Sequence, residues 1–481
     1  MAEKKFSELT AKGATIADTD LVAISESAGG GTYTSKSVTG ANIKALVTDA
    51  NLSTTDVTTN NVSTTKHGFA PKAPNDTTKF LRGDGTWAAP VSGSTSGKFG
   101  VADSTGAYTY YTTLQAAITA ATAGQVVEMF TDYTESTVTA ITLKDGVNIN
   151  GNGHTYSYTA ATGNCFIDNG VAVISRVQNL NVIRTNHTSG NIFTITSGTS
   201  IIDFTGTYLQ CTSASSSDGV ILCGGTISSI NVKAIGANLK GIVVYGYGAK
   251  GIVRDSYAET TGAGTAIYGE NILYGADRGV FNCIGKSVSG YGIYDAQIFN
   301  SHGWSTSGTG IQGDKLNLCT GVSISSYGLV GTYVNNCIGI STSGVAIRGG
   351  LMQNSSANSS TGNAILPNSA GDKYYNSSFY SAGAAVSSWY HVGNYYNCNL
   401  ESAWNNSSGH CIVDWDTMVS STEITNCVLK VANSSANCIY ATNASTPKYA
   451  NNVYSGATTP VNANVTQGIT NTQDNQGNIK L

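Results

Sequence analysis

Short apolar segments alternate with glycine, asparagine and serine along most of this chain. Between residues 289 and 367, the phrase SGYGIYD returns as SGTGIQG, SSYGLVG, SGVAIRG and TGNAILP. A fixed period of this length indicates that one small structural unit is stacked on copies of itself. The central apolar residues of the five phrases recur every 18 positions: Ile293, Ile311, Leu329, Ile347 and Ile365.

Each repeat contains three short apolar pieces instead of one long strand. In SSYGLVGTYVNNCIGIST (325–342) these pieces are LV, YV and CIGI, separated by Gly, Asn and Ser. Strands this short do not suit a stack of ordinary hairpins. They suit a coil in which each strand pairs with the turns above and below it, with Asn and Gly at corners that need a positive φ. The pattern therefore predicts an all-β fold, a parallel β-helix.

The spacing also bears on the handedness of the coil. A left-handed hexapeptide helix shares the 18-residue period, but it requires an aliphatic residue at every sixth position. Turn length varies as well, because Ile242, Ile267 and Ile293 are 25 and 26 residues apart. Both observations favour a right-handed parallel β-helix with turns of 18–26 residues. The sixth positions after Ile293 do not keep the hexapeptide pattern: Phe299, Ser305, Ile311, Asn317 and Ser323.

Composition narrows the possible functions. Charged residues are only 11% of the 481, yet 40% are apolar and 26 are Tyr, which is enough to fold a β-rich core. A net charge of −4 without a basic cluster argues against nucleic acid as a partner. No apolar run is long enough to span a membrane, and MAEKKFSELT lacks an apolar signal core. We therefore expect synthesis in a cytosol, without a membrane span.

The ten cysteines occur in similar settings. Asn precedes Cys in FNCIG, NNCIG, YNCNL and TNCVL, and Cys319 and Cys337 are one period apart. This pattern predicts one inward-facing column of small apolar side chains, as reduced thiols. Disulfides between neighbouring turns remain the alternative. Since CxxC and Cys/His metal spacings are absent, we expect no metal and no other cofactor.

A helix is expected ahead of the repeats, in YYTTLQAAITAATAG (110–124). Thr112 or Thr113 can cap its start, and Gly124 can end it. Together with ITLKDGVNINGNGHTYSY, the segment resembles the opening of the pectate-lyase-like right-handed β-helix superfamily, in which a short helix covers the open end of the coil. Such an end is an unprotected edge and needs a cover. The apolar residues expected on one face of the helix are Leu114, Ala117, Ile118 and Ala121.

The first 50 residues have a pattern of their own. They contain the strand-like DTDLVAI, a Gly-rich turn, the strand-like TYTSKSVT and the helical ANIKALV. This order resembles the N-terminal attachment segment of many bacteriophage tail-fibre and tailspike proteins. The resemblance implies a virion-attachment module at 1–50, with contacts from Asp20, Leu21, Val22 and Ile24.

A connector is expected at 51–98. VSTTKHGFAPKAPNDTTKFLRGDGTWAAP (62–90) resembles a segment that recurs in phage tail proteins, with HGF…P and FLRGDGTW as its hallmarks. Its RGD triplet reads as a tight turn, because Asp84-Gly85 supplies a bend before Trp87. The organisation expected beyond the connector is a β-helix at 99–455 and a C-terminal tail or cap at 456–481.

Right-handed β-helices include many polysaccharide lyases and hydrolases, but a fold does not by itself imply an activity. Glycoside hydrolysis needs two convergent carboxylates. The best candidates are Asp414 and Asp416, which would share one face of a strand, with Glu401 nearby in sequence. A solvated pair is the simpler interpretation, so the sequence leans against an enzyme and assigns no catalytic residue beyond these three weak candidates.

Aromatic residues set among Asn and Ser are concentrated between residues 374 and 415. Some of them must be core residues. Exposed aromatic faces beside amide side chains are also typical of neutral-sugar recognition. We take as glycan-binding candidates Trp389, Tyr390, Trp404 and Trp415.

These patterns favour a phage tail fibre or tailspike that attaches to the virion by its N-terminus and binds a host-surface glycan through its β-helix. The resemblance implies a homotrimer, a virion partner on the tail, baseplate or neck, and a location in the virion after synthesis in the bacterial cytoplasm. Two alternatives remain open. One is a tailspike depolymerase that cleaves host polysaccharide, and the other is a structural neck, collar or head fibre.

Overall fold

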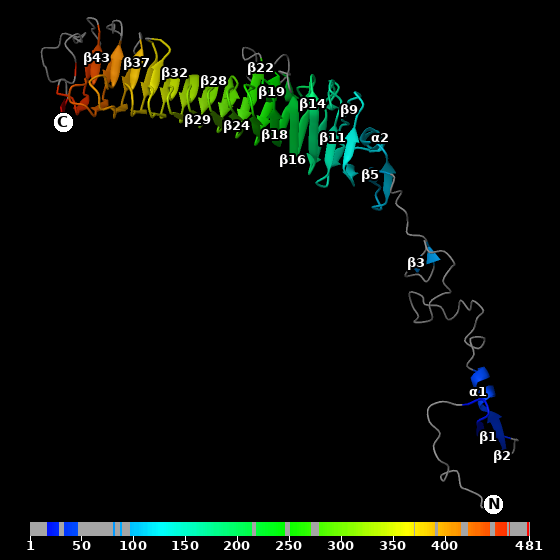
Figure 1. The fold of residues 1–481 in the computed structure, drawn as a ribbon. Helices are drawn as coiled ribbons and strands as arrows, with labels where there is room; N and C mark the ends of the chain where they lie inside the picture. The colour runs from blue at the N-terminus through cyan, green and yellow to red at the C-terminus, as the bar shows by residue number, and fades with distance from the viewer. Residues whose placement is uncertain are drawn as a thin grey trace, which may run out of the picture. The chain divides into compact units, whose positions relative to one another are not determined.

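The chain forms two compact units, Met1–Gly93 and Ser94–Leu481, in the computed structural model (Figure 1). Among the residues that the structure describes, both units consist mainly of β-strands. The residues that the structure describes are 17–27, 33–46, 80–81, 87–88, 97–213, 218–245, 251–270, 279–369, 371–389, 393–414, 422–442, 448–458, 461 and 479–480.

The first unit contains a hairpin followed by a short helix. Strand β1 (Leu21–Ser27) pairs antiparallel with β2 (Tyr33–Thr39), and α1 (Gly40–Leu46) follows directly. The two expected strands and the helix after them are therefore present, and the expected Gly-rich turn lies outside the described residues. Two short strands, β3 (Phe80–Leu81) and β4 (Trp87–Ala88), pair with each other farther along the chain.

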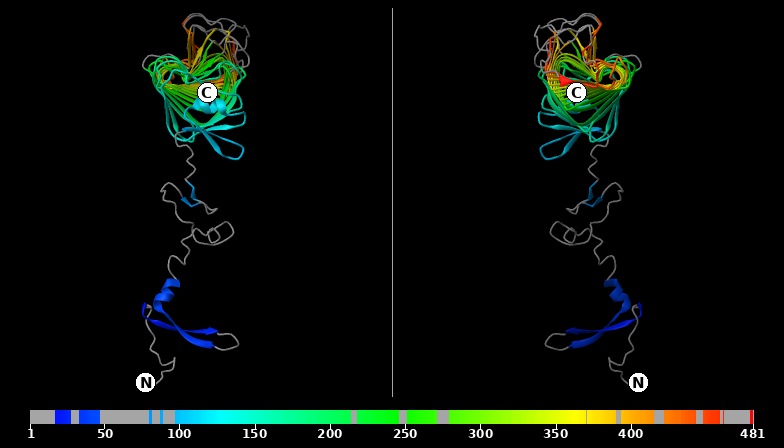
Figure 2. Two further views of the ribbon diagram at one scale, coloured as in Figure 1. Left: turned by 90° about the vertical axis from the view of Figure 1, so that its right-hand side faces the viewer. Right: turned by 90° about the vertical axis from the view of Figure 1, so that its left-hand side faces the viewer.

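The second unit is a right-handed parallel β-helix, as the repeats predict. Its strands form three faces around one interior, which Figure 2 shows in views along the coil. We call these faces A, B and C, in the order in which the chain visits them.

Face A comprises β7 (Val126–Met129), β10 (Asn148–Asn150), β13 (Ile174–Gln178), β20 (Ile252–Arg254), β23 (Gly279–Phe281), β26 (Gln297–Phe299), β35 (Lys373–Tyr375), β38 (Asn394–Tyr396), β41 (Glu423–Thr425) and β44 (Lys448–Ala450). Face B comprises β8 (Tyr133–Glu135), β11 (Thr155–Tyr158), β14 (Asn181–His187), β21 (Tyr257–Thr260), β24 (Ile284–Ser287), β27 (His302–Ser305), β29 (Thr320–Ser323), β31 (Ile338–Ser341), β33 (Ser356–Ser359), β36 (Ser378–Ser381), β39 (Asn399–Ser402), β42 (Val428–Val431) and β45 (Val453–Ser455), and β46 (Ile479–Lys480) pairs with the last of these. Face C comprises β9 (Ile141–Thr142), β12 (Phe166–Ile167), β15 (Phe193–Ile195), β17 (Gly219–Cys223), β19 (Lys240–Tyr245), β22 (Ile267–Glu270), β25 (Ile293–Tyr294), β34 (Ile365–Pro367), β37 (Ser387–Trp389), β40 (Ile412–Asp414) and β43 (Ile439–Ala441).

Five strands run around a corner and belong to two faces. Strands β16 (Ile201–Ser213) and β18 (Thr226–Ile235) join faces A and B. Strands β28 (Ile311–Asn317), β30 (Leu329–Asn335) and β32 (Ile347–Gln353) join faces C and A. The sequence predicts three separate strands in each turn, whereas each of these five strands continues around a corner with a skipped residue or a shift in its pairing register.

A hairpin and a helix close the N-terminal end of the coil. Strand β5 (Phe99–Ala102) pairs antiparallel with β6 (Tyr108–Tyr111) and with β7. Thr113 caps the start of helix α2 (Leu114–Ala120), because its hydroxyl oxygen accepts from the Ala116 amide at 3.3 Å. The expected cap is confirmed, because the apolar face of the helix is buried against the first strands: Leu114, Ala117 and Ile118.

The register between turns matches the sequence repeat. Ile293, Ile311, Leu329, Ile347 and Ile365 are successive pairing partners on face C. All five are fully buried. A side chain at this position has one neighbour above and one below, so the column requires the same apolar character in each turn.

Turn length divides the coil into wide and narrow sections. On face C, Phe166 pairs with Phe193, 27 residues later, whereas the partners from Ile293 to Ile365 are 18 apart. The narrow section has glycine at the inward positions of face B. A Cβ atom at any of these glycines would meet the apolar side chain or backbone of face C: Gly285, Gly303, Gly321 and Gly339.

Asparagine occupies the corner between faces A and B in most turns. Asn282, Asn300, Asn336 and Asn354 all have φ near +50°, in the left-handed region that Asn tolerates. The predicted role of Asn as a corner residue is thus confirmed. Their side chains stack along the coil, for example where Asn300 Nδ2 donates to Asn282 Oδ1 at 3.0 Å.

All ten cysteines are buried and unpaired, as the reduced-thiol hypothesis predicts. Several directly follow the corner residue and point inward. Cys283 Sγ, for example, lies 3.1 Å from the Phe281 carbonyl oxygen. Burial raises the pKa of the Cys283 thiol to about 12. At neutral pH the Cys283 side chain is therefore a core-filling thiol and not a thiolate nucleophile.

Candidate functional site

The asparagine corner is interrupted at one turn of the narrow section. The corner residues 282, 300, 318 and 336 are spaced by 18, but the third is Leu318. Leu318 has φ +56° and an exposed side chain. A leucine in the left-handed region is an outlier, since its Cβ crowds the backbone. Strain of this kind is found preferentially at functional sites.

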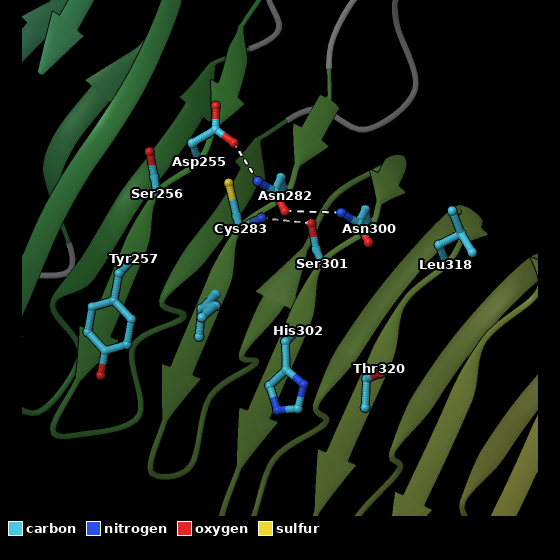
Figure 3. A pocket seen from close by; sticks show the side chains of 11 residues that line it. Asp255, Ser256, Tyr257, Asn282, Cys283, Asn300, Ser301, His302, Leu318 and Thr320 are labelled. Carbon is cyan, nitrogen blue, oxygen red and sulfur yellow. Dashed lines mark hydrogen bonds between the residues drawn. The ribbon is translucent and has the colours of Figure 1, made fainter.

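At the interruption, one amide oxygen of the corner row faces a side chain that cannot donate a hydrogen bond. Asn282 Nδ2 donates to Asp255 Oδ1 at 2.5 Å, and Asn300 Nδ2 donates to Asn282 Oδ1 at 3.0 Å (Figure 3). The next position would supply a donor to Asn300 Oδ1, but Leu318 has none. Among the described residues, no donor to this oxygen is found, so it is available to a ligand.

A groove of about 450 Å³ lies beside this corner, in the size range of small-ligand sites. One wall is the corner row itself, and the other is the first outward column of face B, with Tyr257, His302 and Thr320 (Figure 3). The lining combines amides and hydroxyls with the exposed aliphatic side chains of Ile284 and Leu318.

The groove carries little charge. Asp255 is its one carboxylate, and no Lys or Arg lines it. Burial lowers the pKa of His302, so its imidazole is neutral near pH 7 and can both donate and accept. Tyr257 is oriented by a 3.0 Å hydrogen bond that its hydroxyl donates to Glu259 Oε2. An amphipathic groove with a single carboxylate and no cationic side chain suits an uncharged ligand that presents both C–H faces and hydroxyls.

The groove offers little for catalysis. Hydrolysis of a glycosidic bond requires two carboxyl groups on either side of that bond, and Asp255 is alone here. A metal site is also absent, since no cluster of three or more His, Cys, Asp or Glu occurs in the part of the chain that the structure describes. The geometry therefore supports binding.

The carboxylates singled out in the sequence do not form a described pair. Glu401 lies on face B and makes an ion pair with Lys430 of the next turn, at 2.9 Å. Asp414 is the last residue of β40, and its side chain lies outside the described residues, as does all of Asp416. The hypothesis of catalysis by these residues stays open.

The aromatic candidates are only partly described. Trp389 ends β37 and pairs in register with Asp414, and Trp404 follows β39 with a half-buried side chain. The side chain of Trp389 and all of Tyr390 and Trp415 lie outside the described residues. As expected, part of the aromatic stretch belongs to the core: Tyr374, Phe379 and Tyr395.

Two outward aromatic rows were not anticipated. Tyr375 and Tyr396 stack on face A with ring centroids 4.9 Å apart. Phe281 and Phe299 stack on the same face at 5.2 Å, beneath the Arg254 guanidinium. Aligning the sequence on the asparagine column would have located both the Leu318 interruption and these rows, because each lies at a fixed offset from the corner residue.

The candidate attachment residues lie in the N-terminal hairpin. Leu21 is 69% exposed, Ile24 is 43% exposed, and Val22 is half-buried. Asp20 organises the start of the hairpin, because its Oδ2 accepts from the Ala17 amide at 2.6 Å and its carbonyl accepts from Gly40 at 2.6 Å.

None of the helices in the described part of the chain has both the length and the apolar character needed to cross a membrane. Comparisons of the chain with protein-family models, with curated proteins and with solved structures gave no match.

Proposed function

We propose that this chain is a bacteriophage tail fibre or tailspike that docks on the virion through its N-terminal unit and binds a neutral host-surface glycan through its β-helix. The observation that carries the proposal is the groove at Leu318, an amphipathic site with a single carboxylate and one free amide oxygen. The resemblance of residues 5–50 and 62–90 to phage tail proteins adds the virion context.

The chemistry of the groove favours a sugar over other uncharged ligands. A pyranose ring presents a C–H face that packs on apolar side chains and an equatorial belt of hydroxyls that pairs with amides. Ile284, Leu318 and the Tyr257 ring supply the apolar contact. Asn300 Oδ1, the neutral imidazole of His302 and the Thr320 hydroxyl supply acceptors and donors.

The N-terminal hairpin supports the docking half of the proposal. A two-stranded hairpin is only marginally stable by itself. Leu21 and Ile24 lie on opposite faces of the two-stranded ribbon, because successive side chains of a strand point in opposite directions. Each face therefore exposes an apolar side chain. Such a ribbon is stabilised by inserting between other protein surfaces, and the virion supplies these surfaces in the proposal.

The assembly proposed is a homotrimer located in the virion after synthesis in the bacterial cytoplasm. Each groove offers one small contact area, so its intrinsic affinity for a sugar is low. Three copies of the groove on one fibre would convert weak sites into stable adsorption through effective concentration.

The test incubates the purified full chain with polysaccharide extracted from host cells. Binding without cleavage supports the proposal, and release of shorter oligosaccharides would identify a depolymerase. If the chain neither binds nor cleaves the polysaccharide, the glycan-binding proposal is overturned and the structural fibre is the alternative that stays.

Groove variants place the binding on the structure. Leu318→Asn and Tyr257→Leu should each weaken polysaccharide binding. The matched control is Tyr333→Ser, which removes a 52% exposed aromatic side chain from face A outside the groove. Equal binding by all three variants would move the sugar site elsewhere.

A further inference from the structure

The side chains along the corner between faces A and B form a hydrogen-bonded row with one direction. Asn282 Nδ2 donates to Asp255 Oδ1 of the turn before, and Asn300 Nδ2 donates to Asn282 Oδ1 in the same way (Figure 3). The direction is the same farther along the coil, where Asn397 Nδ2 donates to Asn376 Oδ1 at 3.2 Å. A group that joins this row therefore needs an N–H donor toward one turn and an acceptor oxygen toward the next.

Leu318 interrupts the row in both directions. Its side chain offers no donor to Asn300 Oδ1 and no acceptor to Nδ2 of Asn336, the corner residue of the next turn. Asn336 is exposed, with φ +51°. Turns of the coil are about 4.8 Å apart, so corner positions 300 and 336 are about 10 Å apart. One amide group with a hydrogen bond of about 3 Å on each side spans the gap between the two side chains.

Leu318 also supplies an apolar contact at the interruption. Its side chain is 56% exposed and lines the groove. A methyl group attached to an amide would bury apolar area against this leucine, while the amide itself pairs with the corner row. The combination of a leucine with an amide oxygen on one side and an amide N–H on the other therefore suits an acetylated nitrogen.

The charges around the groove favour a neutral amide over an amine or a carboxylate. Asp255 is three turns before Leu318, about 14 Å along the coil. It is therefore too far from the interruption to pair with an ammonium group there. Among the described lining residues, none is a Lys or Arg that could pair with a carboxylate. An uncharged group that both donates and accepts fits this position.

We propose that the groove selects a neutral sugar that carries an N-acetylamino group. The acetamido N–H donates to Asn300 Oδ1, the acetamido carbonyl accepts from Asn336 Nδ2, and the methyl group packs on Leu318. The sugar ring lies beside the corner, against His302 and Thr320 of face B. A hydroxyl in place of the acetamido group reaches only one of the two amides and brings no methyl group. The inference rests on the proposed function, because it names the class of sugar that the glycan site takes.

The experiment measures competition on the full chain bound to polysaccharide extracted from host cells. N-acetylglucosamine is compared with glucose, and N-acetylgalactosamine with galactose, because each pair differs only in an acetamido group replaced by a hydroxyl. We expect at least one acetamido sugar to displace the polysaccharide at a concentration about tenfold lower than its hydroxyl counterpart. Equal concentrations within both pairs would overturn this inference and leave the proposed function intact. No polysaccharide binding at all would overturn both.

Variants of the corner row assign the preference to the interruption. Asn300→Gly removes the acceptor without backbone strain, because Gly tolerates a positive φ, and it should abolish the preference for acetamido sugars. Asn300→Asp keeps an acceptor oxygen and should retain the preference. The matched control is Asn354→Gly, which removes a corner amide outside the groove whose Oδ1 also accepts from the next turn. If Asn300→Gly keeps the preference, or if Asn354→Gly loses it equally, the inference is overturned.

A second measurement needs no variant and covers the case in which these proteins do not fold. Saturation-transfer NMR on the wild-type chain, with N-acetylglucosamine and N-acetylgalactosamine as probes, compares the acetyl methyl signal with the ring signals. The methyl group should receive the largest saturation for the sugar that binds, because it contacts Leu318. Larger saturation of the ring protons would place the methyl group in solvent and overturn the inference.

Discussion

Gly303 on face B lies directly opposite Ile311 on face C, across the narrowest part of the core. A Cβ atom at Gly303 would meet Ile311 Cγ1 and the Gly310 carbonyl oxygen. The isoleucine fills the space that a second inward side chain would need. The 18-residue turn therefore depends on pairing a large residue on one face with none on the other.

Gly303→Ala should destabilise the coil. The added methyl group meets backbone as well as a side chain, so the core cannot relax without moving a strand. Overpacking of this kind costs about 1–3 kcal/mol, and the thermal midpoint should fall accordingly. Gly371→Ala is the control, because a Cβ atom there would have only Ser369 Oγ within reach, at 3.8 Å. If both variants melt together with the wild type, the narrow core is less tightly packed than the structure indicates.

The repeat made the coil predictable from sequence because stacking imposes the same requirement on each turn. A column such as Ile311, Leu329 and Ile347 must be apolar in every turn, and a corner with positive φ selects Asn. The division into wide and narrow sections was less evident. This division depends on which residues of two faces meet each other across the core. The linear sequence does not show which residues these are.

Leu318→Asn should stabilise the coil while weakening the proposed glycan binding. Asn tolerates the φ of +56° and can donate to Asn300 Oδ1, completing the row. Relief of the left-handed strain is worth about 1–2 kcal/mol. Leu318→Gly separates the two contributions, because it removes the strain without restoring the hydrogen bond. A lower thermal midpoint for Leu318→Asn would show that the leucine itself stabilises the corner.

Stability should fall on mild acidification, with His410 as one cause. Its Nδ1 accepts a hydrogen bond from the Asn437 amide at 2.8 Å, which requires a neutral ring. Burial lowers the pKa of His410 below the ordinary 6.5. Below about pH 6.5 the unfolded chain binds more protons at this residue than the folded chain does. The free energy of unfolding therefore decreases as the pH falls, by at most about 1.4 kcal/mol per pH unit for this group.

The measurement compares thermal midpoints of the wild type and His410→Gln between neutral pH and about pH 5. Gln keeps an acceptor for Asn437 but does not titrate, so the variant should lose less stability on acidification. If the wild type and His410→Gln lose stability equally on acidification, other groups cause the acid sensitivity. Buried His187 and half-buried His302 are candidates, because their pKa values are also lowered.

The candidate sites were harder to predict than the fold, for a physical reason. A core position has one requirement in every turn, whereas a binding position is defined by its departure from that requirement. Leu318 was visible in the sequence only as a break in the asparagine column. The aromatic cluster drew attention first because of its density, but Tyr374 and Tyr395 proved to be fully buried.

Leu21→Ser/Ile24→Ser should reduce incorporation of the chain into phage particles. Both side chains are exposed on the hairpin, so the substitution removes apolar area that docking would bury. The thermal transition of the β-helix should not change, because these residues lie in the other unit. Quantitative immunoblotting of purified virions measures occupancy, with Ile174→Ser as the control. Normal occupancy would place the attachment contacts outside this pair.

Trp404→Ala should weaken adsorption to host cells while leaving thermal stability nearly unchanged. Trp404 follows β39 in the last quarter of the chain, and its side chain is only half-buried. A fibre anchored by its N-terminus presents this part to the host in the proposed arrangement. A ring stacked on a sugar contributes about 0.5–1.5 kcal/mol beyond area burial, and multiple subunits amplify such a difference.

Trp404→Phe keeps a stacking face and should retain most of the adsorption, and Trp415→Ala tests the neighbouring candidate in the same assay. Loss of stability in step with adsorption would assign Trp404 to the core. Unchanged adsorption by both alanine variants, together with weakened binding by the Leu318 variants, would place the sugar contact at the groove alone.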